Sequence, residues 1–477
     1  MIARVLLILL LFVTQYLKGQ LYFDYRHEAD QIAYAATTLP FDRLLIVGTS
    51  GNLATRETNA WLMVVGQQGE FISEFNYGIP GHSLKFKFVR MVGLDIALLA
   101  TEITNLTTYR TRAALMKVSL LQAESPSLLQ LQYWGDTTDH IELLGIAPDG
   151  FQDILMFGKD NATTDGVILR GTQKILWSGN GQQAVSGMAQ RPNAQGWLAL
   201  ISEYEAASLH SVVYLNTQLQ VEGSQPLPEG IYDAQNPEWR NDSSWYCIAA
   251  RKFCLDAPTG LRPKDIVLVQ GQPDSGIVQL NCMGTVNQND KPGGMAMNRE
   301  GNQVLLSWTP AHRIFMPQSQ GYSRNQIPLC LTDTLGVIQA QAMLGESAYY
   351  EVHHLSRPTY GTDGKSWLIA GSRYDIWNSQ TGTDAFWMIF QEGTALQTEA
   401  NWNPESILFS PNPVSRQFPF LKFMALKGTF NIWDLQGRLV QAGNLMPEVE
   451  LVAVDAGVYI LEIITDQGSL KKKLMLQ

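Results

Sequence analysis

The sequence predicts an all-β protein, and three observations lead to this fold class. Short apolar segments of strand length recur between residues 20 and 402, and polar or glycine-containing loops separate them. Residues 403–477 contain shorter apolar alternations of the same kind. Apolar residues at helical spacing do not continue over any length of the sequence.

The N-terminus predicts a secretory signal peptide over residues 1–19. Arg4 precedes the apolar run 5–13, and the small residue Gly19 stands at the expected cleavage position before Gln20. This run is far shorter than the roughly 20 apolar residues of a membrane-spanning helix. No other stretch is long and apolar enough to cross a bilayer, so we expect an exported protein without a transmembrane segment after processing.

Length and composition limit the remaining choices. A chain of 477 residues exceeds one ordinary domain, and we expect one domain over residues 20–402 and a second over residues 403–477. The net charge is −10 and no block of basic residues is present, which argues against nucleic acid as a partner. With 45% hydrophobic and 16% charged residues, the chain is not of the disordered class.

A repeated pair of strands organises the larger domain. Residues 44–50 and 58–65 form one apolar pair, and residues 367–373 and 383–390 repeat it near the other end of the domain. Weaker copies of the first strand lie at 96–101, 154–159, 197–202, 245–250 and 304–308. The resulting seven units have a spacing of roughly 45 to 60 residues, close to the period of propeller blades.

One such unit cannot bury both of its faces, so the units must stack into a closed ring. We therefore predict a seven-bladed β-propeller over residues 20–402; six or eight blades, a pair of β-sandwiches and a β-solenoid remain alternatives. The small residues near the ends of these strands, such as Gly48, Gly158 and Gly371, indicate close approach in a crowded inner channel. The units also resemble the repeats of bacterial secreted propellers, through Asp384-Ala385-Phe386 and the turn from Asp333 to Gly336.

Four cysteines suggest disulfides formed in an oxidising compartment: Cys247, Cys254, Cys282 and Cys330. Sequence alone allows three pairings. A bridge from Cys247 to Cys254 would staple a hairpin and leave Cys282 to reach Cys330 in the next unit. The alternative is four buried free thiols.

The C-terminal domain contains four short motifs in a fixed order: Pro411-Asn412-Pro413; Asp434 with Gly437-Arg438; Gly457 with Tyr459; and Lys471-Lys472-Lys473. Their order and spacing resemble the type A sorting domain of the type IX secretion system. A carbohydrate-binding or adhesive β-sandwich is the alternative.

The resemblance has specific implications for fold, partners and location. It implies that residues 403–477 fold as a small immunoglobulin-like β-sandwich. It also implies a Bacteroidetes-type bacterium, in which the secretion machinery carries the protein across the outer membrane and a surface sortase removes the sorting domain. The product would be secreted or attached at the cell surface.

Catalytic motifs do not stand out in the sequence, and we predict no metal and no cofactor. His353 and His354 are adjacent, and neighbouring strand residues point to opposite faces, so they cannot easily share one metal ion. The nucleophile-elbow, zinc-protease and phosphate-loop motifs are absent. We therefore expect a non-catalytic binding module for an extracellular protein or glycan.

An enzyme is the alternative to this binding module. Carboxylates such as Asp160, Asp165, Asp375 and Asp384 could converge at the propeller mouth and serve a hydrolase or a lyase. The aromatic residues Tyr374 and Trp377 could stack on sugars or pack between blades.

Overall fold

The computed structural model divides the chain into two compact units, Met1–Leu396 and Gln397–Gln477. It describes residues 21–25, 30–41, 43–52, 55–66, 70–121, 126–135, 138–150, 152–179, 181–193, 195–204, 210–252, 264–273, 276–284, 289–311, 325–357, 366–374, 383–391, 409–410, 420–423, 428–434, 438–444, 448–451, 457–465 and 468–476. The predicted signal peptide lies outside these residues. Every regular element within them is a β-strand, which confirms the all-β prediction for the described chain. Among these residues no helix could span a membrane.

The described residues of the first unit form five four-stranded antiparallel sheets and one seven-stranded antiparallel sheet. The first sheet consists of β2 (Asp30–Leu39), β3 (Arg43–Asn52), β4 (Glu57–Gly66) and β5 (Phe71–Tyr77). The second consists of β6 (His82–Val92), β7 (Ile96–Asn105), β8 (Thr111–Ser119) and β9 (Ser127–Trp134). The third consists of β10 (Ile141–Asp149), β11 (Asp153–Asp160), β12 (Asp165–Arg170) and β13 (Gln173–Trp177). The fourth consists of β14 (Gln182–Gln190), β15 (Trp197–Tyr204), β16 (His210–Leu215) and β17 (Val221–Pro226). The fifth consists of β18 (Ile231–Asn241), β19 (Ser244–Lys252), β20 (Lys264–Gln272) and β21 (Gly276–Met283).

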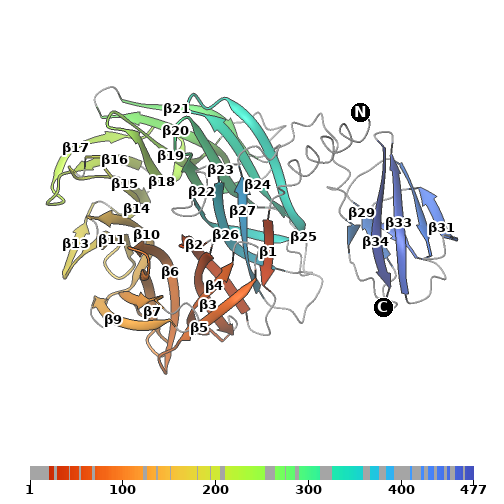
Figure 1. Ribbon diagram of the computed structural model, residues 1–477. Helices are drawn as coiled ribbons and strands as arrows, with labels where there is room; N and C mark the ends of the chain where they lie inside the picture. The colour runs from red at the N-terminus through yellow and green to blue at the C-terminus, as the bar shows by residue number, and fades with distance from the viewer. Residues whose placement is uncertain are drawn as a thin grey trace, which may run out of the picture. The chain divides into compact units, whose positions relative to one another are not determined.

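The seven-stranded sheet joins the two ends of the first unit. Its strands, in spatial order, are β22 (Asn289–Met297), β23 (Gln303–Ala311), β24 (Asn325–Asp333), β25 (Ile338–Ser356), β26 (Ser366–Tyr374), β27 (Thr383–Gln391) and β1 (Leu21–Tyr25). The long strand β25 pairs with β24 through its first part and with β26 from Tyr349 onwards. Strand β1, from the start of the unit, pairs with β27 at its end, and Figure 1 shows the two side by side.

Seven strands lie on the inside of a ring: the first strand of each four-stranded sheet, and β22 and β25 of the seven-stranded sheet. Strands β2, β6, β10, β14, β18, β22 and β25 contact one another in turn, and β25 contacts β2 to complete the circle. Figure 1 shows the sheets of this unit radiating from the common centre. The seven apolar segments singled out in the sequence all lie in the strands next to these inner strands: β3, β7, β11, β15, β19, β23 and β26.

These second strands are apolar on both faces because each face packs on a different neighbouring sheet. In β3, Leu45 belongs to the apolar layer that includes Leu99 of the second sheet. The next residue, Ile46, belongs to the layer that includes Leu368 and Trp387 of the seven-stranded sheet. Since successive strand residues point to opposite faces, this arrangement requires the unbroken apolar runs seen in the sequence.

Each inner strand contains at least one β-bulge where it pairs with the second strand of its sheet. The inserted residues are Tyr34 in β2, Lys87 in β6, Leu144 in β10, Ser186 in β14, Gly293 in β22 and His353 in β25. Strand β18 is irregular at several points. A bulge leaves its extra residue outside the regular pairing, so the alternation of faces is reset at this level in every sheet.

The bulges explain three of the small residues noted in the sequence. A Cβ atom on Gly48 would lie 1.8 Å from the carbonyl oxygen of Ile32 on the inner strand. A Cβ atom on Gly158 would lie 2.0 Å from a backbone oxygen of its inner strand, and a Cβ atom on Gly371 would lie 2.1 Å from the corresponding oxygen. The prediction of close approach is therefore confirmed at these positions, and the approaching group is the inner-strand backbone.

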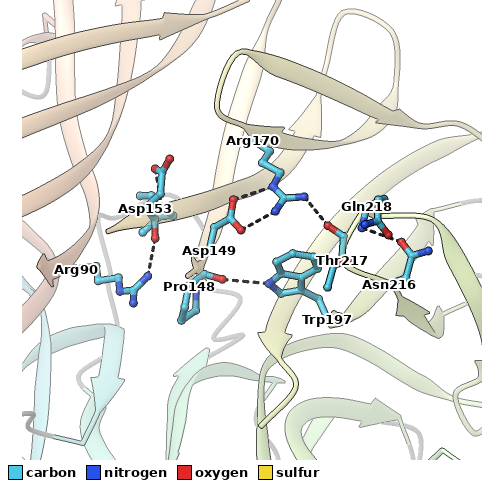
Figure 2. A network of polar contacts seen from close by, with 10 residues as sticks. Arg90, Pro148, Asp149, Asp153, Arg170, Trp197, Asn216, Thr217 and Gln218 are labelled. Carbon is cyan, nitrogen blue, oxygen red and sulfur yellow. Dashed lines mark hydrogen bonds and ion pairs between the residues drawn. The ribbon is translucent and has the colours of Figure 1, made fainter. Parts of the chain in front are cut away.

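Polar contacts also tie neighbouring sheets together at the end where the inner strands finish (Figure 2). The Arg170 guanidinium of the third sheet donates two hydrogen bonds to the Asp149 carboxylate, at 2.8 and 2.9 Å, and a third to the carbonyl oxygen of Thr217, in the turn between β16 and β17 of the fourth sheet. Trp197 of the fourth sheet donates its indole N–H to the carbonyl oxygen of Pro148 at 3.1 Å. Arg90 of the second sheet donates to the carbonyl oxygen of Asp153 at 2.6 Å.

The described strands of the second unit form two antiparallel sheets. One has the order β31 (Leu439–Asn444), β30 (Gly428–Trp433), β33 (Gly457–Thr465) and β34 (Gly468–Leu476). The other has the order β28 (Phe409–Ser410), β29 (Phe420–Phe423) and β32 (Glu448–Glu450). The alternating residues Phe430, Ile432, Leu461 and Ile463 are buried, which defines one packed face of the larger sheet.

The proposed pairing of Cys247 with Cys254 and of Cys282 with Cys330 is wrong. Cys247 and Cys330 are buried free thiols. Cys247 lies in the apolar layer between the fourth and fifth sheets, and Cys330 lies in the layer between the fifth sheet and the seven-stranded sheet. Both thus act as small apolar side chains. Cys282 is disulfide-bonded, and Cys254 lies outside the described residues.

Candidate functional site

Inserted residues from three neighbouring inner strands meet inside the ring. The ammonium group of Lys87 lies 4.7 Å from the centre of the Tyr34 ring. The Tyr34 ring in turn lies 5.2 Å, between centroids, from the imidazole of His353. Because all three are bulge residues, the bulges turn them out of the packed layers between sheets and bring them together.

Charged residues from the adjoining strands extend this group. Lys291 of β22 donates to a carboxylate oxygen of Glu351 on β25 at 2.7 Å. Glu142 of β10 forms an ion pair with Lys159 of β11 at 3.2 Å. We use the term inner-strand cluster for Tyr34, Lys87, Glu142, Lys291, Glu351 and His353. Five of the seven inner strands contribute to it.

The two carboxylates of the inner-strand cluster are held in their charged form. Burial alone would raise the pKa of Glu351, but nearby positive charges lower it below its usual value: His353 once it is protonated, and the ammonium groups of Lys291 and Lys87. The pKa of Glu142 is also lowered, since Lys159 and Lys87 outweigh the effect of burial. Lys87 thus influences both carboxylates, and both are ionised at neutral pH.

The two adjacent histidines are held in their neutral form. Burial lowers the pKa of His353 to about 4; Lys291 and Lys87 act in the same direction, and Glu351 opposes them. Burial also lowers the pKa of His354 to about 4, against a hydrogen bond with the backbone of Ala36. His353 forms a hydrogen bond of 3.0 Å with the Ser372 hydroxyl. Within the described residues, no group of three or more His, Cys, Asp or Glu side chains could hold a metal ion.

The carboxylates singled out in the sequence do not form one site. Asp160 is buried in the third sheet, where it accepts hydrogen bonds from the Lys174 ammonium and from the backbone N–H groups of His140 and Ala162. Asp165 pairs with Asp160 across β11 and β12. Asp384 is buried on β27 of the seven-stranded sheet.

The aromatic candidates give no further information. Tyr374 is the last residue of β26, and its side chain lies outside the described atoms. Asp375 and Trp377 lie outside the described residues.

The motifs of the C-terminal unit lie in two hairpins. Asp434 accepts hydrogen bonds from the backbone N–H and the guanidinium of Arg438, at 2.9 and 2.7 Å, and so closes the loop between β30 and β31. Gly457 begins β33, in which Tyr459 is buried. Lys471, Lys472 and Lys473 lie in β34 and pair with residues 462, 461 and 460. Pro411, Asn412, Pro413 and Gly437 lie outside the described residues.

The family comparison decides what this unit is. Residues 409–477 match the family model of the secretion system C-terminal sorting domain. The chain carries a type IX sorting domain. A protein with this sorting domain is exported through the type IX secretion system, and this chain is therefore secreted or displayed at the cell surface. The sorting domain accounts for the export route and engages the secretion machinery.

Comparisons of the whole chain are less specific. No curated protein matches the sequence. Hydrazine synthase of Kuenenia stuttgartiensis has 9% identity and a TM-score of 0.48, over 76% of this chain and 96% of that one. Prolyl oligopeptidase B from Galerina marginata has 9% identity and a TM-score of 0.42, over 83% and 56%. The β-propeller domain of the trilobed protease from Pyrococcus furiosus has 10% identity and a TM-score of 0.28, over 94% and 93%.

Sequence reasoning singled out His353 only as one of two adjacent histidines, and it missed the inner-strand cluster. Its residues are scattered from position 34 to position 353, and none of them belongs to a recognisable motif. The available signal was a single polar or charged residue inside an apolar inner strand, as in Phe86-Lys87-Phe88.

Proposed function

We propose that the first unit is a seven-bladed β-propeller in which β25 serves two blades. Its second half would be the inner strand of the last blade, which β26, β27 and β1 complete. Five separate four-stranded sheets and a shared seven-stranded sheet support this count. We further propose a signal peptide over residues 1–19, a propeller over residues 20–402 and an immunoglobulin-like sorting domain over residues 403–477.

We propose that the exported propeller is a non-catalytic module that binds an extracellular protein or glycan at the inner-strand cluster. The observation that carries this proposal is the convergence of Tyr34, Lys87 and His353 from three bulged strands, beside the charged Glu351. An aromatic ring, a cation and a carboxylate held this close offer stacking and charged hydrogen bonds to one polar ligand.

The charge state of the cluster favours binding over hydrolysis. A glycosidase of the common type needs one carboxylic acid that stays protonated and one that is ionised. Glu142 and Glu351 both have lowered pKa values, so the cluster lacks the protonated partner. The alternative of a hydrolase or lyase at the propeller mouth would require a different pair of groups.

Array binding tests the proposed function. The mature chain would be applied to glycan and peptide arrays beside the variants Lys87→Gln and Tyr34→Leu, with Lys117→Gln on β8 of the second sheet as the matched control. We expect both cluster variants to lose the signals of the wild type and the control to keep them. Unchanged signals in the cluster variants, or turnover of an array substrate by the wild type, would refute the proposal.

Deletion tests the fate of the sorting domain. A chain that lacks residues 410–477 should remain in the periplasm, whereas the full chain should reach the surface or the medium without its sorting domain, as expected if a surface sortase removes it. Intact mass of the exported protein would show both processing events. An exported protein that retains residues 410–477 would contradict sortase removal.

A further inference from the structure

An exposed arginine and an exposed tyrosine stack on each other between the first and second sheets. Arg56 lies in the turn between β3 and β4, and Tyr109 lies in the turn between β7 and β8. The guanidinium carbon of Arg56 is 5.5 Å from the centre of the Tyr109 ring. Tyr109 is 55% exposed, although large aromatic side chains are usually well covered. This pair lies at the end of the sheets where the inner strands begin.

The backbone holds both residues in an unfavourable conformation. The φ angles are +63° at Arg56 and +56° at Tyr109, a region that residues with bulky side chains seldom adopt. Such strain persists only where the surroundings fix it, and it is concentrated at sites of function. The ring and the guanidinium are thus presented on stiff turns, which lowers the entropy lost when a ligand binds.

Hydrogen bonds show how the Tyr109 turn is fixed. The Asn105 side-chain oxygen accepts from the backbone N–H groups of Thr107 and Thr108, both at 2.9 Å. The N–H of Tyr109 donates to the carbonyl oxygen of Asn105 at 2.8 Å. The N–H of Leu106 donates to the carbonyl oxygen of Gly81, which anchors the turn to the loop before β6.

The charge around the pair is positive, although the chain as a whole carries −10. Arg110 follows Tyr109 and is exposed, and Arg56 is exposed as well. Glu57 is the exposed acidic residue beside them. Thr107 and Thr108, which precede Tyr109 in the turn, are exposed as well. The surface formed by Arg56, Tyr109 and Arg110 therefore combines a flat ring with two cations.

We propose that Arg56, Tyr109 and Arg110 form a binding site for an acidic saccharide, one whose sugar rings carry carboxylate or sulfate groups. This inference rests on the proposed binding function and adds a ligand class at a second location. In a sugar acid, a flat C–H face and an anionic group lie within one residue. The C–H face stacks on Tyr109, and the guanidinium groups bind the anion through paired hydrogen bonds. An acidic peptide carries its carboxylates on flexible side chains without such a face.

Calorimetric titration of the mature chain tests this site. The probes are a galacturonic acid hexamer, a sulfated hexasaccharide of heparin type, an uncharged galactose hexamer and a glutamate hexapeptide. We expect binding of one or both charged saccharides and at least tenfold weaker binding of the galactose hexamer and the peptide. Arg56→Ala and Tyr109→Ala should each weaken saccharide binding by about tenfold, and Tyr109→Phe should retain most of it.

A matched control comes from the other end of the same sheet. Arg43 stacks on Phe41 at the same distance of 5.5 Å, and Phe41 also has a positive φ, of 63°. Because Phe41 lies in the turn between β2 and β3 and Arg43 begins β3, Arg43→Ala should leave saccharide binding unchanged.

Each outcome of the titration decides the proposal. Failure of both charged saccharides to bind, or unchanged binding in Arg56→Ala and Tyr109→Ala, would overturn it. Equal binding of the peptide with the same response to the variants would assign the surface to acidic peptides instead. Loss of array signals in Lys87→Gln would still support the inner-strand cluster, so the two proposals can fail separately.

Discussion

Acidification should destabilise the first unit through His353 and His354. Both rings have a pKa of about 4 in the folded chain, whereas the ordinary value is 6.5. The unfolded chain therefore binds more protons than the folded chain between pH 6.5 and pH 4. The stability associated with the neutral rings is complete above pH 6.5 and is lost progressively as the pH falls to 4.

The size of this effect follows from the pKa difference. Each pH unit within the window changes the free energy of unfolding by about 1.4 kcal/mol for each ring. Between pH 6.5 and pH 5 the loss is therefore about 2 kcal/mol for each histidine. Glu351 and Glu142 have lowered pKa values, so their contribution is lost only at more acidic pH, below the ordinary range of a glutamate.

Urea unfolding at pH 7 and pH 5 measures this effect. The wild type is compared with His353→Gln and His354→Gln, and His82→Gln, at the first residue of β6, serves as the control. Each of the first two variants should lose about 2 kcal/mol less than the wild type on going from pH 7 to pH 5. A histidine variant with the same pH dependence as the wild type would refute the assignment of a neutral ring at that position.

Three further predictions concern packing and covalent chemistry. Gly158→Ala should destabilise the first unit by more than about 3 kcal/mol in urea unfolding, because its Cβ would lie 2.0 Å from the carbonyl oxygen of Glu142. The control is Gly150→Ala, where φ is +70° and the space around the glycine is open, and this variant should lower the free energy of unfolding by only about 1 kcal/mol. Equal losses in Gly158→Ala and Gly150→Ala would contradict the argument that the bulged inner strand requires a glycine. Arg170→Met should lower the free energy of unfolding by about 1 to 3 kcal/mol, because the hydrogen bonds to Asp149 and the contact with Trp197 are lost. The same substitution at the exposed Arg299 should be nearly neutral. Similar values for both variants would argue against the network of Figure 2. In thiol labelling, Cys247 and Cys330 should react only after unfolding, since burial raises the pKa of both thiols, that of Cys330 to about 11. Cys282 should react only when the chain is reduced in addition to being unfolded, and we expect Cys254 as its disulfide partner.

The strands of the first unit could be predicted because their burial leaves a direct trace in the sequence. A strand such as β3, with a different sheet on each face, must be apolar at successive positions, and this pattern is visible without knowledge of the fold. The inner strands gave a weaker signal, since polar residues such as Lys87 interrupt them. Pairing of β1 with β27 joins residues at opposite ends of the unit, and no local pattern predicts such a contact.

The cysteines show how a correct premise led to a wrong assignment. An even number of cysteines in an exported chain does favour disulfides. However, Cys247 and Cys330 occupy positions in β19 and β24 whose neighbours along each strand are buried apolar residues. These unbroken apolar runs are the sequence signal that would have placed both thiols in the layers between sheets.

The bulges connect the fold to the candidate site. In a regular inner strand, every side chain would point towards one neighbouring sheet or the other, and a lysine such as Lys87 would be excluded by the cost of burying its charge. An inserted residue is released from this alternation, so Tyr34, Lys87 and His353 can differ in chemistry without disturbing the apolar layers. Glycines such as Gly48 and Gly371 on the second strand are the structural requirement for this freedom, because any larger residue would collide with the inner-strand backbone. The ring can therefore keep its packed sheets constant while the residues at one level of its inner strands vary, and the proposed binding site depends on this freedom.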